Sequence, residues 1–243
     1  MISMRKSKSA WRSAMGACAL LSGALASQGV ASAQDKAPIF SIDFADQSDA
    51  SAYDWLEDKG FELKEDADND KKIVLSFAEE ALHIRAVKPA LGLILHEQDV
   101  PGASRMRLHW GVSDYPDGAS YEKGVDNEAI MVHVFFGHEK ISSGSMLVPD
   151  SPYFIGFFLC RNDRLETPYK GRYFKKGGRY ICVDHDKPSE TAVTEVDLDA
   201  EFKSSFGLDQ APAVSGLAIE VDTTHAKNDG KAAAFVKRIE FLE

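Results

Sequence analysis

Hydrophobic and polar residues alternate along most of the chain after residue 36, which is the pattern of strands with one buried face. The alternation is clearest in Ala81–Val87 and Met106–Val112. Further strands are expected at Ile73–Phe77, Leu91–His96, Glu128–Phe136, Tyr153–Cys160, Gly178–Val183, Val193–Val196, Val214–Val221 and Ala232–Phe241. Turns rich in Gly, Pro and Asp separate these short segments, so the sequence predicts an antiparallel β-sandwich or barrel.

Helical periodicity is scarce. A helix is expected over Asp199–Phe206, because apolar residues recur there at every fourth position and Gly207 follows as a left-handed end. A second short helix is expected over Ala50–Leu56. With no repeat and no linker after residue 36, we predict one domain over residues 34–243, an all-β sandwich with one or two short helices at its edges.

Residues 1–33 have the three parts of a secretory signal peptide. Four basic residues precede the apolar run Ala14–Ala26, and Ala31-Ser32-Ala33 is a small-residue cleavage site. The run is short for a membrane anchor. We therefore expect cleavage after Ala33 and a periplasmic or secreted product.

Charge and composition exclude several classes of partner. The chain is 44% hydrophobic and 27% charged, which is globular composition. Removing residues 1–33 takes away four basic residues and no acid, so the net charge falls from −10 to −14. Such a chain repels nucleic acid and anionic membranes, and no later apolar run is long enough to span a bilayer. We expect no nucleic-acid partner and no membrane insertion.

Two cysteines follow the leader, Cys160 and Cys182. In an oxidising compartment paired cysteines usually join, and the bond would close a loop of about twenty residues worth about 3 kcal/mol. Two buried free thiols are the alternative. No Cys-x-x-Cys motif points to a catalytic thiol.

The segment Arg161–Arg179 is the sharpest charge anomaly, with seven basic residues against two acids and with aromatic residues interleaved. Guanidinium groups and aromatic rings suit an anionic or neutral glycan. A solvated hairpin tip is the alternative. The expected ligand contacts are Arg164, Tyr169, Arg172, Tyr173 and Lys175. A patch on one strand is the second choice, formed by Arg107, His109 and Trp110.

Catalytic candidates are fewer. His109 and His133 would meet if their strands were neighbours, and acids in the loop Ser113–Asn127 could form the carboxyl pair of a glycosidase. Asp66–Asp70 is similar to the start of a calcium loop but lacks its glycine and its bidentate glutamate. We therefore predict no catalytic residue, no metal and no cofactor.

Several short strand signatures carry a family resemblance. They are His109-Trp110-Gly111-Val112, Asp126–Ala129, Val132–Phe136, Tyr153, Val196-Asp197-Leu198, Phe206-Gly207, Gly216–Ile219, Asp222-Thr223 and the last strand to Phe241. Over residues 80–243 the chain resembles a bacterial exported family, the domain-of-unknown-function 3047 family. The resemblance implies an exported jelly-roll sandwich, similar in shape to carbohydrate-binding modules, with no established activity.

Three functions follow as expectations. The first is an exported, non-catalytic binding domain for a saccharide or cell-envelope glycan. The second is a glycoside hydrolase or lyase that acts on a polysaccharide and uses acids of Ser113–Asn127 with His109 or His133. The third is a structural partner of an envelope complex, which needs an exposed apolar patch of several hundred Å².

Overall fold

The computed structural model describes residues 37–45, 47, 51–185 and 187–243. The expected signal peptide, residues 1–33, lies outside the described residues. The elements are β1 (Phe40–Asp43), α1 (Ala52–Asp58), β2 (Glu62–Glu65), β3 (Ile73–Ala78), β4 (Ala81–Ala86), β5 (Leu91–His96), β6 (Arg105–Asp114), β7 (Glu128–Ile141), β8 (Ser151–Leu159), β9 (Pro168–Tyr169), β10 (Gly178–Asp184), β11 (Ala192–Asp197), α2 (Leu198–Phe206), β12 (Val214–Asp222) and β13 (Ala232–Leu242). A 3-10 turn spans Tyr121–Lys123.

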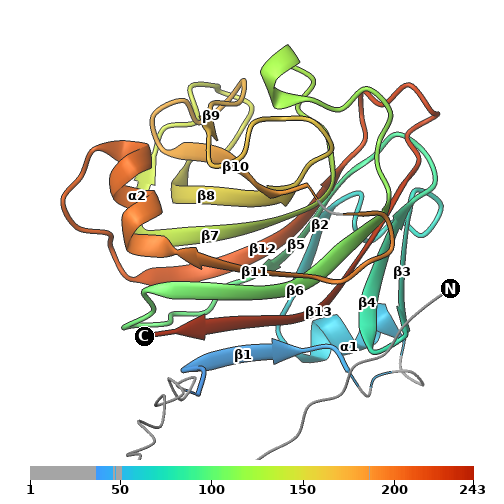
Figure 1. Ribbon diagram of the computed structural model, residues 1–243, viewed down its shortest axis with the longest axis horizontal. Coiled ribbons are helices and arrows are strands. Elements are labelled where there is room, and N and C mark those ends of the chain that lie inside the picture. Colours follow the sequence, from blue (N-terminus) through green and yellow to red (C-terminus); the bar gives the residue numbers. More distant parts are fainter. Residues whose placement is uncertain (1–36, 46, 48–50, 186) are drawn as a thin grey trace, which may run out of the picture. The chain divides into compact units, whose positions relative to one another are not determined.

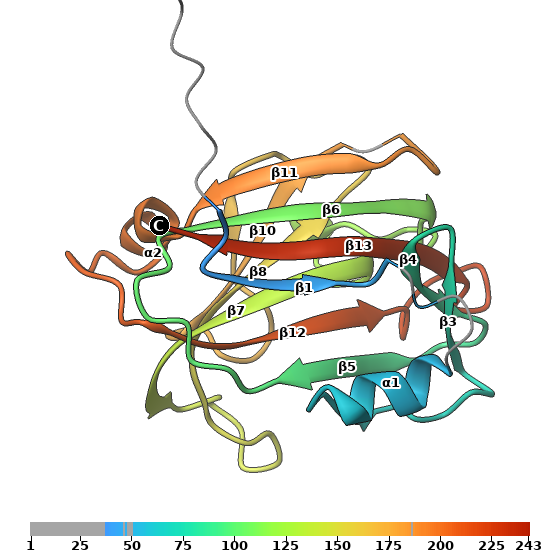
Figure 2. The same cartoon turned by 90° about the horizontal axis from the view of Figure 1, so that it is seen from below.

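The strands form two sheets packed as a sandwich (Figure 1). The six-stranded sheet has the order β11-β6-β13-β4-β3, and β1 also pairs with β13. Figure 2 shows β11, β6, β13 and β1 of this sheet side by side. The seven-stranded sheet has the order β2-β5-β12-β7-β8-β10-β9. From β5 to β13 the chain repeatedly crosses between the sheets, as in jelly rolls, so the predicted sandwich is confirmed.

One strand pair departs from the antiparallel rule. β10 lies parallel to β8, with Tyr180 opposite Gly156, whereas every other pair among the described strands is antiparallel. A parallel pair cannot be joined by a tight hairpin. The chain therefore travels back along the sheet between the two strands, and this return segment is the basic stretch 161–177.

The core lies between the sheets and holds large side chains with almost no exposure. The largest are Trp110, Phe44, Phe136, Phe157, Phe202 and Phe241. Trp110 also satisfies its polar group, because its indole Nε1 donates to Thr194 Oγ1 at 3.0 Å. Alternate residues of the central strands point into this layer, which leaves the other half of each strand for the outer faces.

Both helices form near the positions that the sequence predicts. α2 begins after Asp197, whose carboxylate accepts the Ala200 N–H at 2.8 Å, and it ends at Gly207 with φ 69°. Phe202 packs from this helix onto Phe136 of β7. None of the described helices is both long enough and apolar enough to cross a membrane.

Candidate functional site

The outer face of the seven-stranded sheet carries the most unusual chemistry among the described residues. The six-stranded sheet covers only its inner face. The outward side chains of the central strands are Leu91, Leu93 and Leu95 on β5, Ala218, Glu220 and Asp222 on β12, Glu128, Met131, His133 and Phe135 on β7, Phe154 and Phe158 on β8, and Tyr180 on β10. Carboxyl groups thus stand in the middle of an apolar and aromatic surface.

A β-bulge brings Glu128 to this face. Glu220 pairs with Met131, but Asp222 pairs with Glu128, so β7 contains one more residue than β12 between these pairs. Strict alternation would point Glu128 inward with Ile130 and Val132. The extra residue turns its side chain outward, where it meets Glu220.

The pKa values of Glu128 and Glu220 are shifted in opposite directions. Burial is the main cause that raises the pKa of Glu128 well above its usual range, and repulsion from Glu220 adds to it. Burial would also raise the pKa of Glu220, but attraction to His133 and the hydrogen bond from Glu128 outweigh it and lower that pKa. The buried Glu128 therefore holds the proton, and Glu220, whose side chain is 18% exposed, is the carboxylate.

His133 and Tyr121 flank this pair. His133 Nε2 lies 3.3 Å from Glu220 Oε2, an ion-pair distance without hydrogen-bond geometry. The Tyr121 hydroxyl donates to Glu128 Oε2 at 2.7 Å, and burial raises the pKa of this phenol well above its ordinary value. Gly156 leaves room for this arrangement, because a Cβ there would lie 2.3 Å from Met131 Sδ and 3.0 Å from the His133 ring.

Tyr121 is held in place from a distant part of the chain. The buried Asp163 accepts hydrogen bonds from Ser120 Oγ at 2.6 Å, Tyr121 N at 3.0 Å and Glu122 N at 3.3 Å. These bonds cap the 3-10 turn as an N-cap carboxylate caps a helix. The Tyr121 ring then packs on Phe158.

Asp222 is the next outward residue on β12 after Glu220. Its Oδ1 accepts from Asn127 Nδ2 at 2.8 Å and from Thr224 N and Oγ1 at 2.8 and 2.6 Å. Burial nevertheless dominates and raises its pKa to about 6. Asp126, half-buried nearby, has a raised pKa for the same reason. The site is therefore acidic on its open side.

Two of the predicted loop contacts, Arg164 and Tyr169, pack against the turn that carries Tyr121. Arg164 Nε donates to Glu122 Oε1 at 2.5 Å, and the Tyr169 hydroxyl donates to the same oxygen at 3.0 Å. The Tyr169 ring lies 6.0 Å from that of Tyr121. The basic segment thus packs against the turn that carries Tyr121. The side chains of Arg164, Arg172 and Lys175 are nevertheless exposed, as the alternative of a solvated hairpin tip expects.

The other three predicted loop residues, Arg172, Tyr173 and Lys175, are also exposed. The Arg172 guanidinium lies 5.3 Å from the Tyr173 ring centroid, a cation–π distance. The side chain of Lys175 is exposed, and its carbonyl accepts from Arg179 Nη1 at 3.1 Å. Their role in ligand binding stays a prediction.

The second-choice patch lies on the opposite outer face. Arg107 and His109 point outward from β6, where Arg107 pairs with Glu195 at 2.9 Å and His109 Nε2 lies 3.6 Å from Glu240. Trp110 points the other way and is buried in the core. Arg107 and His109 therefore share one outer face, and it is not the face beside which the predicted loop contacts lie.

The catalytic arrangement expected from the sequence does not form. His109 and His133 lie in different sheets, so they do not meet. In the loop Ser113–Asn127 the side chains of Asp114, Asp117 and Glu122 are exposed, and only Asp126 turns toward the sheet. The carboxyl groups that do converge are Glu128 and Glu220, which strict alternation of strand residues would separate.

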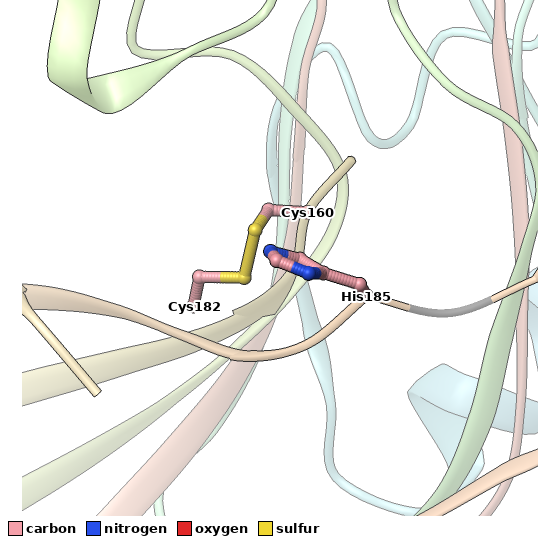
Figure 3. Close-up of side chains that lie close together, drawn as sticks. All are labelled: Cys160, Cys182 and His185. Carbon is pink, nitrogen blue, oxygen red and sulfur yellow. A yellow bond between two sulfur atoms is a disulfide. The ribbon is translucent and has the colours of Figure 1, made fainter. Parts of the chain in front are cut away.

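The predicted disulfide is confirmed. Cys160 and Cys182 are bonded, with their Cα atoms 5.7 Å apart, across the parallel pair of strands. The His185 ring lies beside the two sulfur atoms (Figure 3), and the three ligand atoms are within 4.8 Å of one another. Because each Sγ is bonded to the other, this group does not offer thiolates to a metal. No other such cluster occurs among the described residues. Asp66 instead pairs with Lys72 at 2.8 Å in a turn.

A cavity of about 200 Å³ adjoins Glu128. Its wall includes Glu128 and Asn127, the loop 115–120 and the start of the return segment, 160–163. Glu128 Oε1 is buried, with no conventional donor within reach. The cavity therefore has Glu128 in its wall, whereas Glu220, His133 and Asp222 are not among its lining residues.

No protein-family model matches the sequence, and no curated protein matches it either. Solved structures of similar shape include a mutant of the carbohydrate-binding module CBM29-2 complexed with cellulohexaose, at 7% identity and TM-score 0.35, covering 83% of this chain and 90% of that chain. The carbohydrate recognition domain of Emp46p in its potassium-bound form has 12% identity and TM-score 0.41, covering 82% and 95%.

An endo-1,4-β-xylanase of Trichoderma reesei has 11% identity and TM-score 0.29, covering 71% of this chain and 93% of that chain. These TM-scores and identities do not place the chain in any of the three families.

Proposed function

We propose that this protein binds a neutral saccharide on the outer face of its seven-stranded sheet. The observation that carries the proposal is Glu220, a partly exposed carboxylate whose pKa is lowered, at the centre of a largely apolar and aromatic sheet face. Sugar hydroxyls donate to carboxylates, and the C–H faces of sugar rings pack on apolar and aromatic side chains. Both kinds of contact are available within a few residues of Glu220.

The apolar part of this surface comes from three strands of the seven-stranded sheet. Leu93 and Leu95 of β5, Phe135 of β7 and Tyr180 of β10 are each half-buried, so part of each side chain faces solvent. They lie on both sides of Glu220 in the sheet order. A pyranose ring placed over them would exchange water for contact with carbon atoms.

The charge of the site selects against acidic ligands. Glu220, Asp222 and Asp126 face the same surface, and a uronate or phosphate group would meet repulsion there. Exposed cations of the return segment, Arg172 and Lys175, stand at the rim. We therefore propose a neutral chain over the sheet, with the basic residues as peripheral contacts.

Export remains part of the proposal. The leader-like residues 1–33 and the disulfide both support an oxidising compartment outside the cytoplasm. Membership of the domain-of-unknown-function 3047 family also stays a prediction, as does an envelope component as partner. The exposed large apolar residues of the described chain are scattered, except for Met146 and Leu147, so a broad docking patch has little support.

Affinity electrophoresis in gels that contain xylan, β-1,3-glucan, mixed-linkage β-glucan or mannan tests the proposal. We expect retardation by at least one of them and a loss of affinity of about tenfold or more in Glu220→Gln, since a hydrogen bond to a charged group contributes about 1.5–3 kcal/mol. Glu57→Gln is the matched control, because it makes the same change at an exposed position of α1.

A double variant with Arg172 and Tyr173 both changed to Ala tests whether these exposed residues contribute to the affinity. Arg107→Ala tests the same for the second-choice patch on β6. Loss of binding in Arg107→Ala with no effect of Glu220→Gln would move the site to the six-stranded sheet. Absence of retardation by any of the four polysaccharides would refute the proposal.

A further inference from the structure

Two apolar side chains at the tip of the loop between β7 and β8 are fully open to solvent. Met146 is 104% exposed and Leu147 is 94% exposed, whereas Val193, the next most exposed large apolar residue of the described chain, is 60% exposed. Figure 2 shows the loop 142–150, drawn in yellow-green, projecting beyond the sheets. Water around two neighbouring apolar side chains is unfavourable, so this tip is a candidate contact surface.

The exposure of these side chains belongs to a loop with its own hydrogen bonds. Ser143, near the base of the loop, is buried. Its N–H donates to Asp150 Oδ1 at 2.9 Å, and its hydroxyl donates to the Val148 carbonyl at 2.6 Å. These bonds join the two arms of the loop and leave Met146 and Leu147 at its far end.

Three exposed lysines lie at the base of the same loop. The Phe174 N–H donates to the Ser143 carbonyl at 3.0 Å, which places this part of the return segment against the loop. Lys175 and Lys176 follow Phe174 directly, and Lys140 precedes the loop near the end of β7. Among the described residues, none of the three lysines forms a salt bridge. Their charges are therefore available to a ligand.

The tip lies in a basic part of an acidic protein. Segments 138–150 and 170–179 hold six basic residues and two acids, whereas the whole chain has a net charge of −10. The acids of the sheet face lie near Glu128, the first residue of β7, and the loop follows the last residue of that strand. The 14 residues of β7, at about 3.4 Å each, exceed the screening length of about 8 Å several times. An anion at the tip therefore meets mainly the lysines.

We propose that this tip docks onto an anionic lipid bilayer, with Met146 and Leu147 in the interfacial layer and the three lysines against the headgroup phosphates. Apolar insertion and a basic patch are two signals that together give stable peripheral binding. The apolar pair gains by leaving water, and each lysine adds attraction to the anionic surface. The proposal is independent of saccharide binding. It differs from the expectation, drawn from net charge alone, that the chain is repelled by anionic membranes.

A bilayer fits this tip better than a protein surface does. A stable protein interface buries about 800 Å² on each partner, and two side chains at the end of a loop offer only part of that area. A second copy of the chain would bring the same lysines together in a symmetric contact, where they repel one another. A bilayer needs no complementary shape, and its phosphates match the lysines in charge.

Co-sedimentation of the full chain with lipid vesicles tests the proposal. The vesicles consist of phosphatidylcholine alone or of phosphatidylcholine with about 30% of the anionic lipid phosphatidylglycerol. We expect the partition coefficient to be at least about tenfold higher on the anionic vesicles. It should fall strongly when the salt concentration rises from about 50 mM to about 500 mM, because salt screens the lysines.

Two double variants separate the apolar and the ionic contributions. Met146→Ser with Leu147→Ser should lower the partition coefficient on anionic vesicles at least about tenfold. Lys140→Gln with Lys176→Gln should lower it about tenfold on anionic vesicles and leave it unchanged on phosphatidylcholine alone. All variants keep residues 1–33, so the contribution of that segment is common to every measurement.

Matched controls change the same residue types away from the tip. Val193→Ser removes the next most exposed apolar side chain, on the edge strand β11. Lys88→Gln with Lys231→Gln removes two other exposed lysines. Both controls should partition as the wild type does.

The position of the tip in the bilayer is measured with Leu147→Trp and brominated lipids. Their bromine atoms lie in the apolar layer and should quench this variant more than the wild type. Absence of extra quenching, or equal partition of the wild type and the Met146, Leu147 double variant, would overturn the proposal. So would absence of partition on either kind of vesicle. Retardation by polysaccharide should be the same in the double variant as in the wild type, so the two proposals stand or fall separately.

Discussion

Asp222 should destabilise the folded protein at neutral pH. Its carboxyl is largely removed from water, and burial raises its pKa to about 6 from the ordinary 3.8. A carboxyl that holds its proton more tightly in the folded state favours folding at low pH. That advantage is lost as the pH rises from about 3.8 through about 6, and above this range both states are ionised.

The magnitude follows from the two pKa values. The difference between about 6 and 3.8 corresponds to about 3 kcal/mol at pH values above both. Asp222→Asn removes the ionisation, and the amide oxygen can still accept the three hydrogen bonds that reach Oδ1. We therefore expect the variant to be more stable than the wild type by up to about 3 kcal/mol at about pH 7.5, and nearly equal to it at about pH 4.

Urea denaturation at a series of pH values between about 4 and about 8, with the disulfide intact, measures both free energies of unfolding. Asp209→Asn serves as the matched control, because the side chain of Asp209 is fully exposed and the change should leave the free energy unaltered at every pH. A difference between wild type and Asp222→Asn that does not vary with pH would refute the reasoning. So would a variant less stable than the wild type at about pH 7.5.

Two further predictions concern the frame of the site. Replacing Cys160 and Cys182 together by Ser should lower the free energy of unfolding, measured in urea, by about 3 kcal/mol. A reductant should lower the free energy of unfolding of the wild type but not that of the double variant. Gly156→Ala should displace the His133 ring and Met131 and weaken saccharide retardation severalfold. Unchanged retardation in Gly156→Ala would show that binding does not depend on the position of His133.

Much of the fold could be predicted from the sequence, because its strands obey simple alternation. β4 and β6 occupy nearly the predicted ranges, and α2 begins and ends where its cap and its glycine place it. Three strands were not expected. β1 and β9 are short, and β2 is exposed along most of its length, so none has the burial that produces a hydrophobic pattern.

The site was harder to predict, for a physical reason. Glu128 is two residues from Ile130 and four from Val132, so simple alternation would place its side chain in the core with theirs. Only the bulge turns the Glu128 side chain to the outer face. Glu220 sits at an ordinary outward position, where a charged residue is expected to be solvated. A glutamate in the first position of a long apolar strand and a second one between Ile219 and Val221 were the available signals. Which strands neighbour each other decides whether such residues meet, and that information is non-local.

The basic segment illustrates the converse case. Its composition marked it correctly as unusual, and it does pack beside the acidic face through Tyr169 and Tyr121. The partner of Arg164, however, is an acid of the facing loop, Glu122, and the two largely neutralise each other. Residue type alone does not show which charges are already paired.

The parallel pairing of β8 and β10 has a consequence for how this protein can diversify. The chain must retrace the length of a strand between them, and the Cys160–Cys182 bond anchors both ends of that detour. Because the bond holds the two strands together, insertions or exchanges in the detour outside β9 leave the pairing of β8 with β10 unchanged. A scaffold built this way can acquire new ligand preferences in one surface segment while its interior stays the same.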